Sequence, residues 1–182
     1  MGILIFGRPN SGRKTLASLL PTAIEQCAYG DYGEPGGTIT IRCRSGSAGQ
    51  SQIREIKEQL QRTCLETVSR CRYVTLIDIE DLSADAQQDL KSLMNTPDVV
   101  FILVTSRTCN LDKGVIDRCL HRVCMHFPSA TQVESLIATL CMEYKIDFAL
   151  SPLANSNQEV FRNYRDIFLF INNYLMRFRN AN

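Results

Sequence analysis

The residues with the clearest chemical potential lie in the turn GRPNSGRKT, from Gly7 to Thr15. The turn stands between two short apolar stretches, which is the layout of a phosphate-binding loop whose backbone N–H groups and helix N-terminus surround an anion. The pattern G-x-x-x-x-G-K-[ST] requires lysine directly after its second glycine, whereas this chain has Arg13 there, with Lys14 and Thr15 one place late. A glycine-containing turn that binds nothing is the alternative. The candidate phosphate-binding residues are Gly7, Asn10, Ser11, Gly12, Arg13, Lys14 and Thr15.

Two acids near the end of the apolar stretch Tyr73–Asp81 form a second candidate site. A nucleotidase places the carboxylates that hold Mg²⁺ and polarise water at such a position. The sequence therefore predicts Asp78 and Glu80 as candidate catalytic residues.

The composition is that of an ordinary globular protein and excludes several classes of function. The 182 residues carry a net charge of +1, so any contact with nucleic acid has to come from a local basic patch. No apolar run approaches the roughly 20 residues of a membrane span, and residues 1–6 are too short for a secretory signal, so an intracellular protein is expected. The 8 cysteines include no C-x-x-C pair and only 2 histidines accompany them, so no metal-ligating residues are predicted.

The spacing of apolar residues predicts an alternation of strands and helices. Val99–Val104 is the most apolar stretch and is predicted to be a central strand buried on both faces. Pro21 indicates a kink or an early end in the first helix, and Ser45–Ser51 is predicted to be a flexible polar connection. The other predicted strands are Thr38–Cys43, Tyr73–Asp81 and Arg122–Phe127, and the predicted helices are Lys14–Ala28, Gln52–Val68, Ser83–Met94, Thr131–Tyr144 and Gln158–Met176.

This order of elements predicts an α/β fold in which parallel strands are flanked by helices. Only helices are expected after Pro128. We therefore expect an α/β core over residues 1–127 and a small helical domain over residues 128–182.

Five separate stretches resemble one family, the AAA+ clamp-loader small subunits, and within it the subunit of replication factor C whose own ATPase is degenerate. The resemblance implies an AAA+ P-loop core, a helical lid, and ATP or ADP bound weakly or not at all, with Mg²⁺ only where nucleotide binds. The stretches, in order, are GRPNSGRKT, TITIRCRSGSAGQSQIREIKEQL, VTLIDIEDLSADAQQDL, IDRC (Ile116–Cys119) and RNYR (Arg162–Arg165).

The positions that depart from the family pattern are those of hydrolysis. The resemblance places the family's Mg²⁺-holding acid on Ile77, its catalytic glutamate on Asp78, its following acid on Glu80 and its sensor 1 asparagine on Ser106. An isoleucine cannot ligate Mg²⁺, and Asp78 is one methylene shorter than glutamate. Little or no intrinsic ATPase activity is therefore expected. The alternative is a shifted but functional site in which Asp78 and Glu80 hold Mg²⁺.

Arg118 in the IDRC stretch stands where the family carries the arginine of its Ser-Arg-Cys motif. The resemblance implies an arginine finger that reaches a nucleotide held by a neighbouring subunit. Asp117 replaces the family's serine and is positioned in sequence to pair with Arg118. A surface arginine at the start of a strand is the alternative.

Two further arginines have roles that only the resemblance implies. Arg165 matches the sensor 2 arginine of the lid, which faces bound phosphate; its alternative is a solvated charge. Arg54, helped by Arg42, Arg44 or Lys57, is the candidate DNA contact at the start of the Gln52 helix. The family's basic position there falls on Ile53, and a solvated helix face is the alternative.

The resemblance also implies partners: other AAA+ clamp-loader subunits, a sliding clamp and primer-template DNA, in the nucleus and without a membrane. The segment that helps to enclose adenine and the helical collar of the family are not seen in this sequence. The leading interpretation is a non-hydrolysing clamp-loader subunit that donates Arg118 during clamp loading. The alternatives are an autonomous P-loop NTPase or nucleotide kinase using Lys14, Thr15, Asp78 and Glu80, and an AAA+ scaffold that retains only protein contacts.

Overall fold

A computed structural model of the chain describes residues 1–30, 35, 37–62, 71–143, 165 and 169. Its contacts divide the chain into two compact units. The first comprises Met1–Gly7 and Gly12–Met125, and the second comprises Arg8–Ser11 and His126–Asn182. The predicted domain boundary at residues 127 and 128 stays a prediction, as does the assignment of the second part as a lid.

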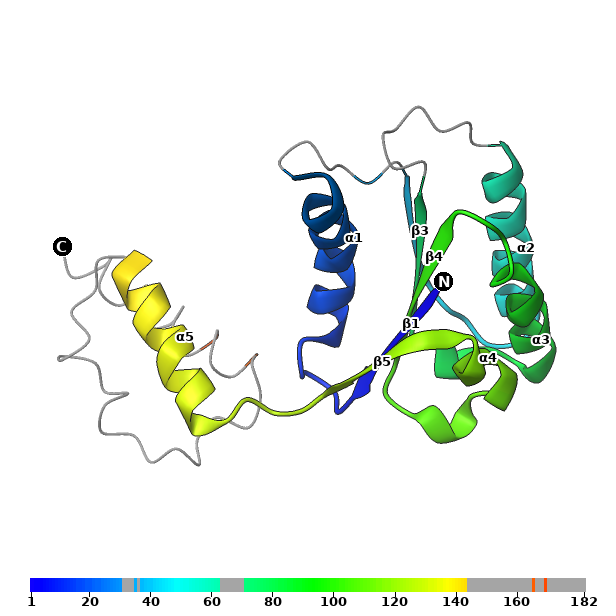
Figure 1. Cartoon of the computed structure of the whole chain (residues 1–182). Coiled ribbons are helices and arrows are strands. Elements are labelled where there is room, and N and C mark those ends of the chain that lie inside the picture. Colours follow the sequence, from blue (N-terminus) through cyan, green and yellow to red (C-terminus); the bar gives the residue numbers. More distant parts are fainter. Residues whose placement is uncertain (31–34, 36, 63–70, 144–164, 166–168, 170–182) are drawn as a thin grey trace, which may run out of the picture. The chain divides into compact units, whose positions relative to one another are not determined.

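The first unit alternates strands with helices, as the apolar spacing predicted (Figure 1). Strand β4 is buried at every residue. Within the described residues, no helix is both long and apolar enough to cross a membrane. The strands are β1 (Gly2–Gly7), β2 (Thr38–Arg42), β3 (Arg72–Ile77), β4 (Val99–Thr105) and β5 (Cys119–Met125), and the α-helices are α1 (Arg13–Tyr29), α2 (Ser47–Arg62), α3 (Ala84–Leu93) and α4 (Lys113–Asp117).

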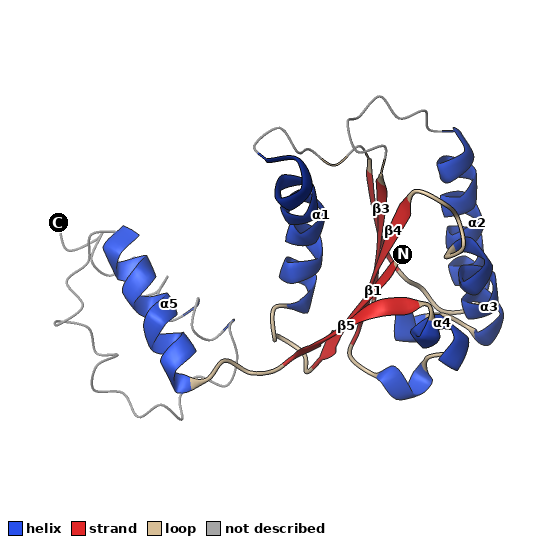
Figure 2. Ribbon diagram, viewed as in Figure 1, coloured by secondary structure: helices blue, strands red, loops and turns tan. Residues whose placement is uncertain are grey.

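The five strands form one parallel sheet in the order β2-β3-β4-β1-β5. The fold class predicted from the sequence is confirmed. Helix α1 covers one face of the sheet, and α2 and α3 cover the other (Figure 2). All carboxyl ends of parallel strands lie along one edge, where α/β proteins of this kind bind their ligands. The start of α1 and the acids after β3 therefore meet at the same edge.

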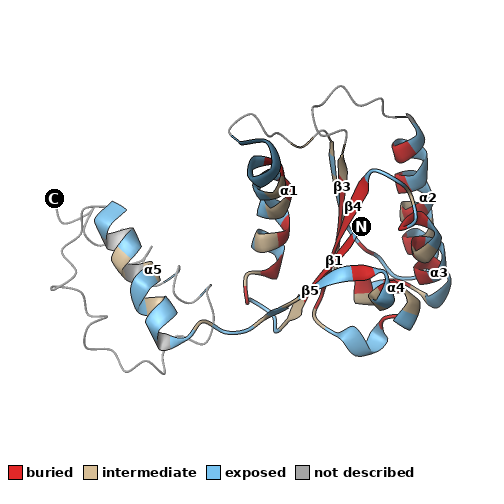
Figure 3. Cartoon of the chain, viewed as in Figure 1, coloured by how far each residue is buried: buried red, intermediate tan, exposed pale blue. Residues whose placement is uncertain are grey.

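The sheet has an apolar layer on each face because successive side chains of a strand point to opposite sides. Phe101 and Leu103 of β4 belong to the cluster shared with α2 and α3, whereas Val100, Ile102 and Val104 belong to the cluster beneath α1. Figure 3 shows the buried residues concentrated on the strands and on the helix faces that meet them. Burial on both faces explains why β4 reads as an uninterrupted apolar run.

Helix α1 matches the predicted Lys14–Ala28 within one residue at each end and continues through Pro21, so the early end, one of the two effects suggested by this proline, is not found. Three boundaries differ from the predictions. Strand β5 spans Cys119–Met125 rather than Arg122–Phe127. Helix α2 begins at Ser47, within the stretch predicted to be a flexible connection, so residues 47–51 are helical rather than loose. Strand β3 ends at Ile77 because Asp78 has a left-handed backbone with φ of 58°, and a 3₁₀ turn, Ile79–Asp81, follows.

In the second unit, helix α5 spans Ala130–Glu143, within one residue of the prediction at each end. The predicted helix Gln158–Met176 lies almost wholly outside the described residues; Arg165 and Leu169 are its only described positions, and both are exposed.

Candidate functional site

The turn after β1 leads into helix α1, whose N-terminus has no side-chain cap. Gly12 is the N-cap of α1 and has a left-handed backbone with φ of 83°. The first intrahelical bond runs from Leu16 N to Gly12 O at 2.9 Å, no side chain caps the helix, and its first turn holds no acid. The N–H groups at the start of a helix have no partner inside the helix, and the helix dipole favours an anion beside them. This end of α1 therefore keeps the backbone chemistry of a phosphate-binding turn.

Arg13, in the place of the family's lysine, is the first residue of α1 and is buried, with 7% of its surface exposed. Its Nη1 atom is buried and has no hydrogen-bond partner among the described residues. A buried guanidinium without a partner is costly unless an anion compensates it. Thr15, by contrast, is exposed.

The side chain of Lys14 forms an ion pair with Asp78. Its Nζ lies 2.9 Å from Asp78 Oδ2, and Arg42 Nε lies 2.8 Å from the same oxygen. Lys14 comes from the start of α1, Arg42 ends β2, and Asp78 follows β3. We name these three residues the ion cluster. It joins the carboxyl ends of β2 and β3 to the start of α1.

The pKa of Asp78 is lowered by the ion cluster. Partial burial acts to raise this pKa, but the hydrogen bond and charge of Lys14, followed by those of Arg42, outweigh it. Asp78 is therefore ionised at neutral pH and is a poor proton acceptor.

We expect this carboxylate to make the free energy of unfolding sensitive to acid. Because the pKa of Asp78 is lower in the folded state, its carboxylate stabilises the protein at pH values above its ordinary pKa of 3.8. This stabilisation is lost as the pH falls through the pKa of the folded state. Urea midpoints measured across this range should fall less steeply for Asp78→Asn than for the wild type. Asp89→Asn, at an exposed position in α3, is the control and should keep the wild-type slope. An unchanged slope in Asp78→Asn would show that the ion cluster adds nothing to stability.

Glu80 and Ser106 also meet at this edge. Glu80 Oε1 accepts a hydrogen bond from the Ser106 backbone N–H at 2.9 Å and another from the Ser106 hydroxyl. Partial burial acts to raise the pKa of Glu80, but these bonds from Ser106 outweigh it and lower the pKa. Glu80 Oε2 is buried and has no partner among the described residues. The structure thus brings together the second acid and the sensor 1 position.

The described residues do not fit a Mg²⁺ ion. Mg²⁺ prefers six oxygen ligands and keeps several of its waters. Asp78 Oδ2 is already shared by two cations, the free oxygen of Glu80 is a buried atom, and Ile77 supplies no oxygen. No group of three or more metal-ligating side chains occurs in the described part of the chain.

Three candidate phosphate contacts belong to the second unit. The Asn10 backbone has φ of 62°, and Ser11 N donates to Arg8 O at 3.4 Å. Ser11 is fully buried, and its Oγ lacks a partner among the described residues. Arg165 is exposed.

Arg118 directly follows α4 and is exposed, yet it is held in place. Its Nη1 donates to Gly114 O at 2.8 Å and its Nε to Asn95 Oδ1 at 3.4 Å. Asp117 lies 3.5 Å from Arg122 instead, so the expected pairing of Asp117 with Arg118 is not found. A guanidinium has five N–H donors, so three remain for another group. Asn95 was missed from the sequence because it lies 23 residues before Arg118.

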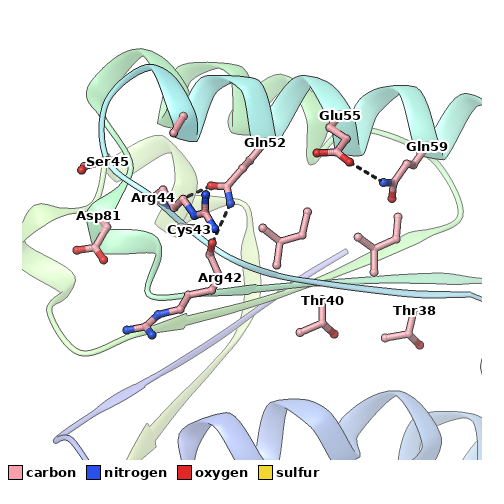
Figure 4. A pocket seen from close by; sticks show the side chains of 13 residues that line it. Thr38, Thr40, Arg42, Cys43, Arg44, Ser45, Gln52, Glu55, Gln59 and Asp81 are labelled. Atoms are coloured by element: carbon pink, nitrogen blue, oxygen red, sulfur yellow. Dashed lines mark hydrogen bonds between the residues drawn. The ribbon is translucent and has the colours of Figure 1, made fainter.

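Arg54, the candidate DNA contact, is the eighth residue of α2 because the helix begins at Ser47. It is exposed beside the buried Ile53, so it is not at the helix N-terminus as predicted. A groove of about 1060 Å³ lies between α2 and β2, lined on the helix by Ala48, Gln52, Glu55 and Gln59 (Figure 4). Gln52 bridges its end, donating to Arg42 O at 2.9 Å and accepting from Arg44 N at 3.0 Å. The Arg42 side chain points away from α2 in this view.

No protein-family model matches the chain. The chain is similar to the replication factor C small subunit 1 of three archaea, Pyrobaculum islandicum, Pyrobaculum arsenaticum and Pyrobaculum aerophilum. Each is 27% identical over 119 residues, which is 64% of this chain and 34% of the relative. The chain thus spans about a third of the length of these curated relatives. Because all three are archaeal, they do not support the expected nuclear location.

Two solved structures from Thermotoga maritima share the fold. A DNA polymerase III gamma subunit-related protein is 23% identical, with a TM-score of 0.59 over 82% of this chain and 50% of its own. The RuvB Holliday junction branch migration motor is 14% identical, with a TM-score of 0.59 over 80% of this chain and 44% of its own. The chain thus shares the fold of these two proteins and has a distant sequence similarity to replication factor C small subunits.

Proposed function

We propose that the chain is a subunit of a replication factor C-like clamp loader that does not hydrolyse ATP itself and donates Arg118 to ATP held by a neighbouring subunit. The observation that carries the proposal is a contrast between two sites. Arg118 is exposed, oriented and has unused donors, whereas the acid in the catalytic position, Asp78, is bound by two cations.

The geometry supports the proposed absence of hydrolysis. Phosphoryl transfer depends on the joint placement of a lysine, Mg²⁺ and a residue that orients water. Here Lys14 is paired with Asp78, and the two acids offer Mg²⁺ no open set of oxygens. An aspartate with a lowered pKa is also a weak base.

The names of the relatives support the remainder of the proposal. They name a small subunit of replication factor C, and we propose on that basis that the partners are other clamp-loader subunits, a sliding clamp and primer-template DNA. Arg54 and Arg165, both exposed, are proposed to contact DNA phosphates and bound nucleotide respectively. ATP or ADP is proposed to bind at the turn weakly.

A turnover assay on the purified chain separates this function from an autonomous NTPase or nucleotide kinase. We expect no ATP hydrolysis above buffer, and no difference between the wild type and Lys14→Ala. Sustained hydrolysis that Lys14→Ala abolishes would replace the proposal with an NTPase that uses Lys14, Thr15, Asp78 and Glu80. The third function, a scaffold for protein contacts, is separated by substitution of Arg118.

A further inference from the structure

The start of α1 and the ion cluster together carry an excess of positive charge. Arg13, Lys14 and Arg42 supply three cations, and Asp78 supplies one anion. These four side chains carry a net charge of +2, which is the charge that a Mg²⁺ ion would bring to a nucleotide, and they lie beside an uncapped helix N-terminus. The carboxylate of Glu80, at the same edge, is bonded to Ser106 and reduces the excess to one positive charge.

The ion cluster leaves most of its hydrogen-bond donors unused. The Lys14 ammonium has three N–H donors, of which one meets Asp78, and the Arg42 guanidinium has five, of which one does. The side chains of Lys14 and Arg42 are 49% and 75% exposed, so ligand oxygens can reach them. Asp78 therefore holds both cations at this edge of the sheet, and each of them keeps N–H donors that are able to bind an anion.

A divalent cation is disfavoured at the same place. It would approach Asp78 against the positive charges of Lys14 and Arg42, which both lie within 3 Å of Asp78 Oδ2.

We infer that the start of α1 binds the phosphates of a nucleotide without Mg²⁺, with Lys14 and Arg42, held together by Asp78, in the place of the metal. This inference rests on the phosphate-binding turn of the proposed function but not on Arg118. It concerns binding alone, and no bond is made or broken.

The test is the binding of a fluorescent ATP derivative, mant-ATP, to the purified full chain in excess EDTA and in excess MgCl₂. The Kd values should agree within about threefold, less than 1 kcal/mol. Arg42→Gln should weaken the EDTA binding several-fold because one positive charge is lost. Arg44→Gln is the matched control: it removes the same charge from an exposed arginine two residues further on that makes no ion pair with described residues, and should change Kd little. Circular dichroism checks that each variant is folded.

Three outcomes would overturn the inference: binding at least about tenfold tighter with MgCl₂, equal weakening by both arginine variants, or no binding in either buffer. None of these results tests the proposal that Arg118 acts on a neighbouring subunit, because that proposal is tested by measuring ATP hydrolysis in an assembly. Hydrolysis of ATP by the purified chain would instead overturn the proposed function.

Discussion

If the chain acts in the proposed clamp loader, changing Arg118 to alanine should lower the ATPase rate at the neighbouring site by about 10³- to 10⁵-fold, the range measured for arginine fingers. The reason is that a guanidinium neutralises charge that develops on the transferred phosphoryl group. Its two internal bonds, to Gly114 and Asn95, fix the direction of the side chain before a partner binds. The measurement is steady-state ATP hydrolysis by the purified assembly.

Arg122→Ala is the control for this experiment. Arg122 is also exposed and lies four residues further along the chain, but it is paired with Asp117. Its removal should leave the rate within a few-fold of wild type. Arg118→Lys should recover little activity because an ammonium lacks the planar fork of donors. If Arg118→Ala leaves the rate unchanged while the assembly stays intact, Arg118 is not a finger and the scaffold interpretation is favoured.

Gly7→Ala should have the largest effect on stability, a loss of about 2 to 5 kcal/mol in the free energy of unfolding. Gly7 has φ of 146°, a conformation that side chains rarely adopt. A Cβ atom there would also overlap the carbonyl oxygen of Met125, the residue opposite Gly7 in the pairing of β1 with β5. Relief requires the two strands to separate at the point where the turn begins. Urea unfolding followed by circular dichroism gives the difference.

The matched control is Gly46→Ala. Gly46 also has a positive φ, of 67°, but an added Cβ meets nothing within 4 Å. Its cost should be about 1 to 2 kcal/mol, the backbone component alone. Equal losses in the two variants would mean that the contact with Met125 does not constrain the turn.

The local spacing of apolar residues was sufficient to predict most strands of the sheet. The uninterrupted apolar run of β4 and the period-two alternation of β2 each reflect burial that is fixed by strand geometry, so both were predicted. The start of α2 at Ser47 was not predicted from the sequence. Glycine and serine have low helix propensity, but Gly49 packs closely against the Arg44 backbone and Leu82, where a larger residue would not fit. Tertiary packing therefore outweighed composition.

The candidate site also has a part that local pattern predicts and a part that it does not. The glycine turn and the acids after β3 are candidates because each is a residue type at a set position in a short motif, and Arg118 is a candidate from the family resemblance. The partners of these residues were not found: Lys14 lies 64 residues from Asp78, and Arg42 lies 36 residues from it. Arg42 had been assigned to a possible DNA surface instead.

The sequence by itself determined which residues are capable of chemistry and which elements carry them, because apolar periodicity and turn chemistry act over neighbouring residues. Only the tertiary structure decided that Lys14 and Arg42 share one oxygen of Asp78, that Glu80 is bound to Ser106, and that Arg118 rests on Asn95. The physical reason is the strand order, which places the ends of β2, β3 and β4 side by side although long helical connections separate them in the chain. Charges attract over a few ångströms in space, and no local pattern records which distant residues the sheet will bring that close.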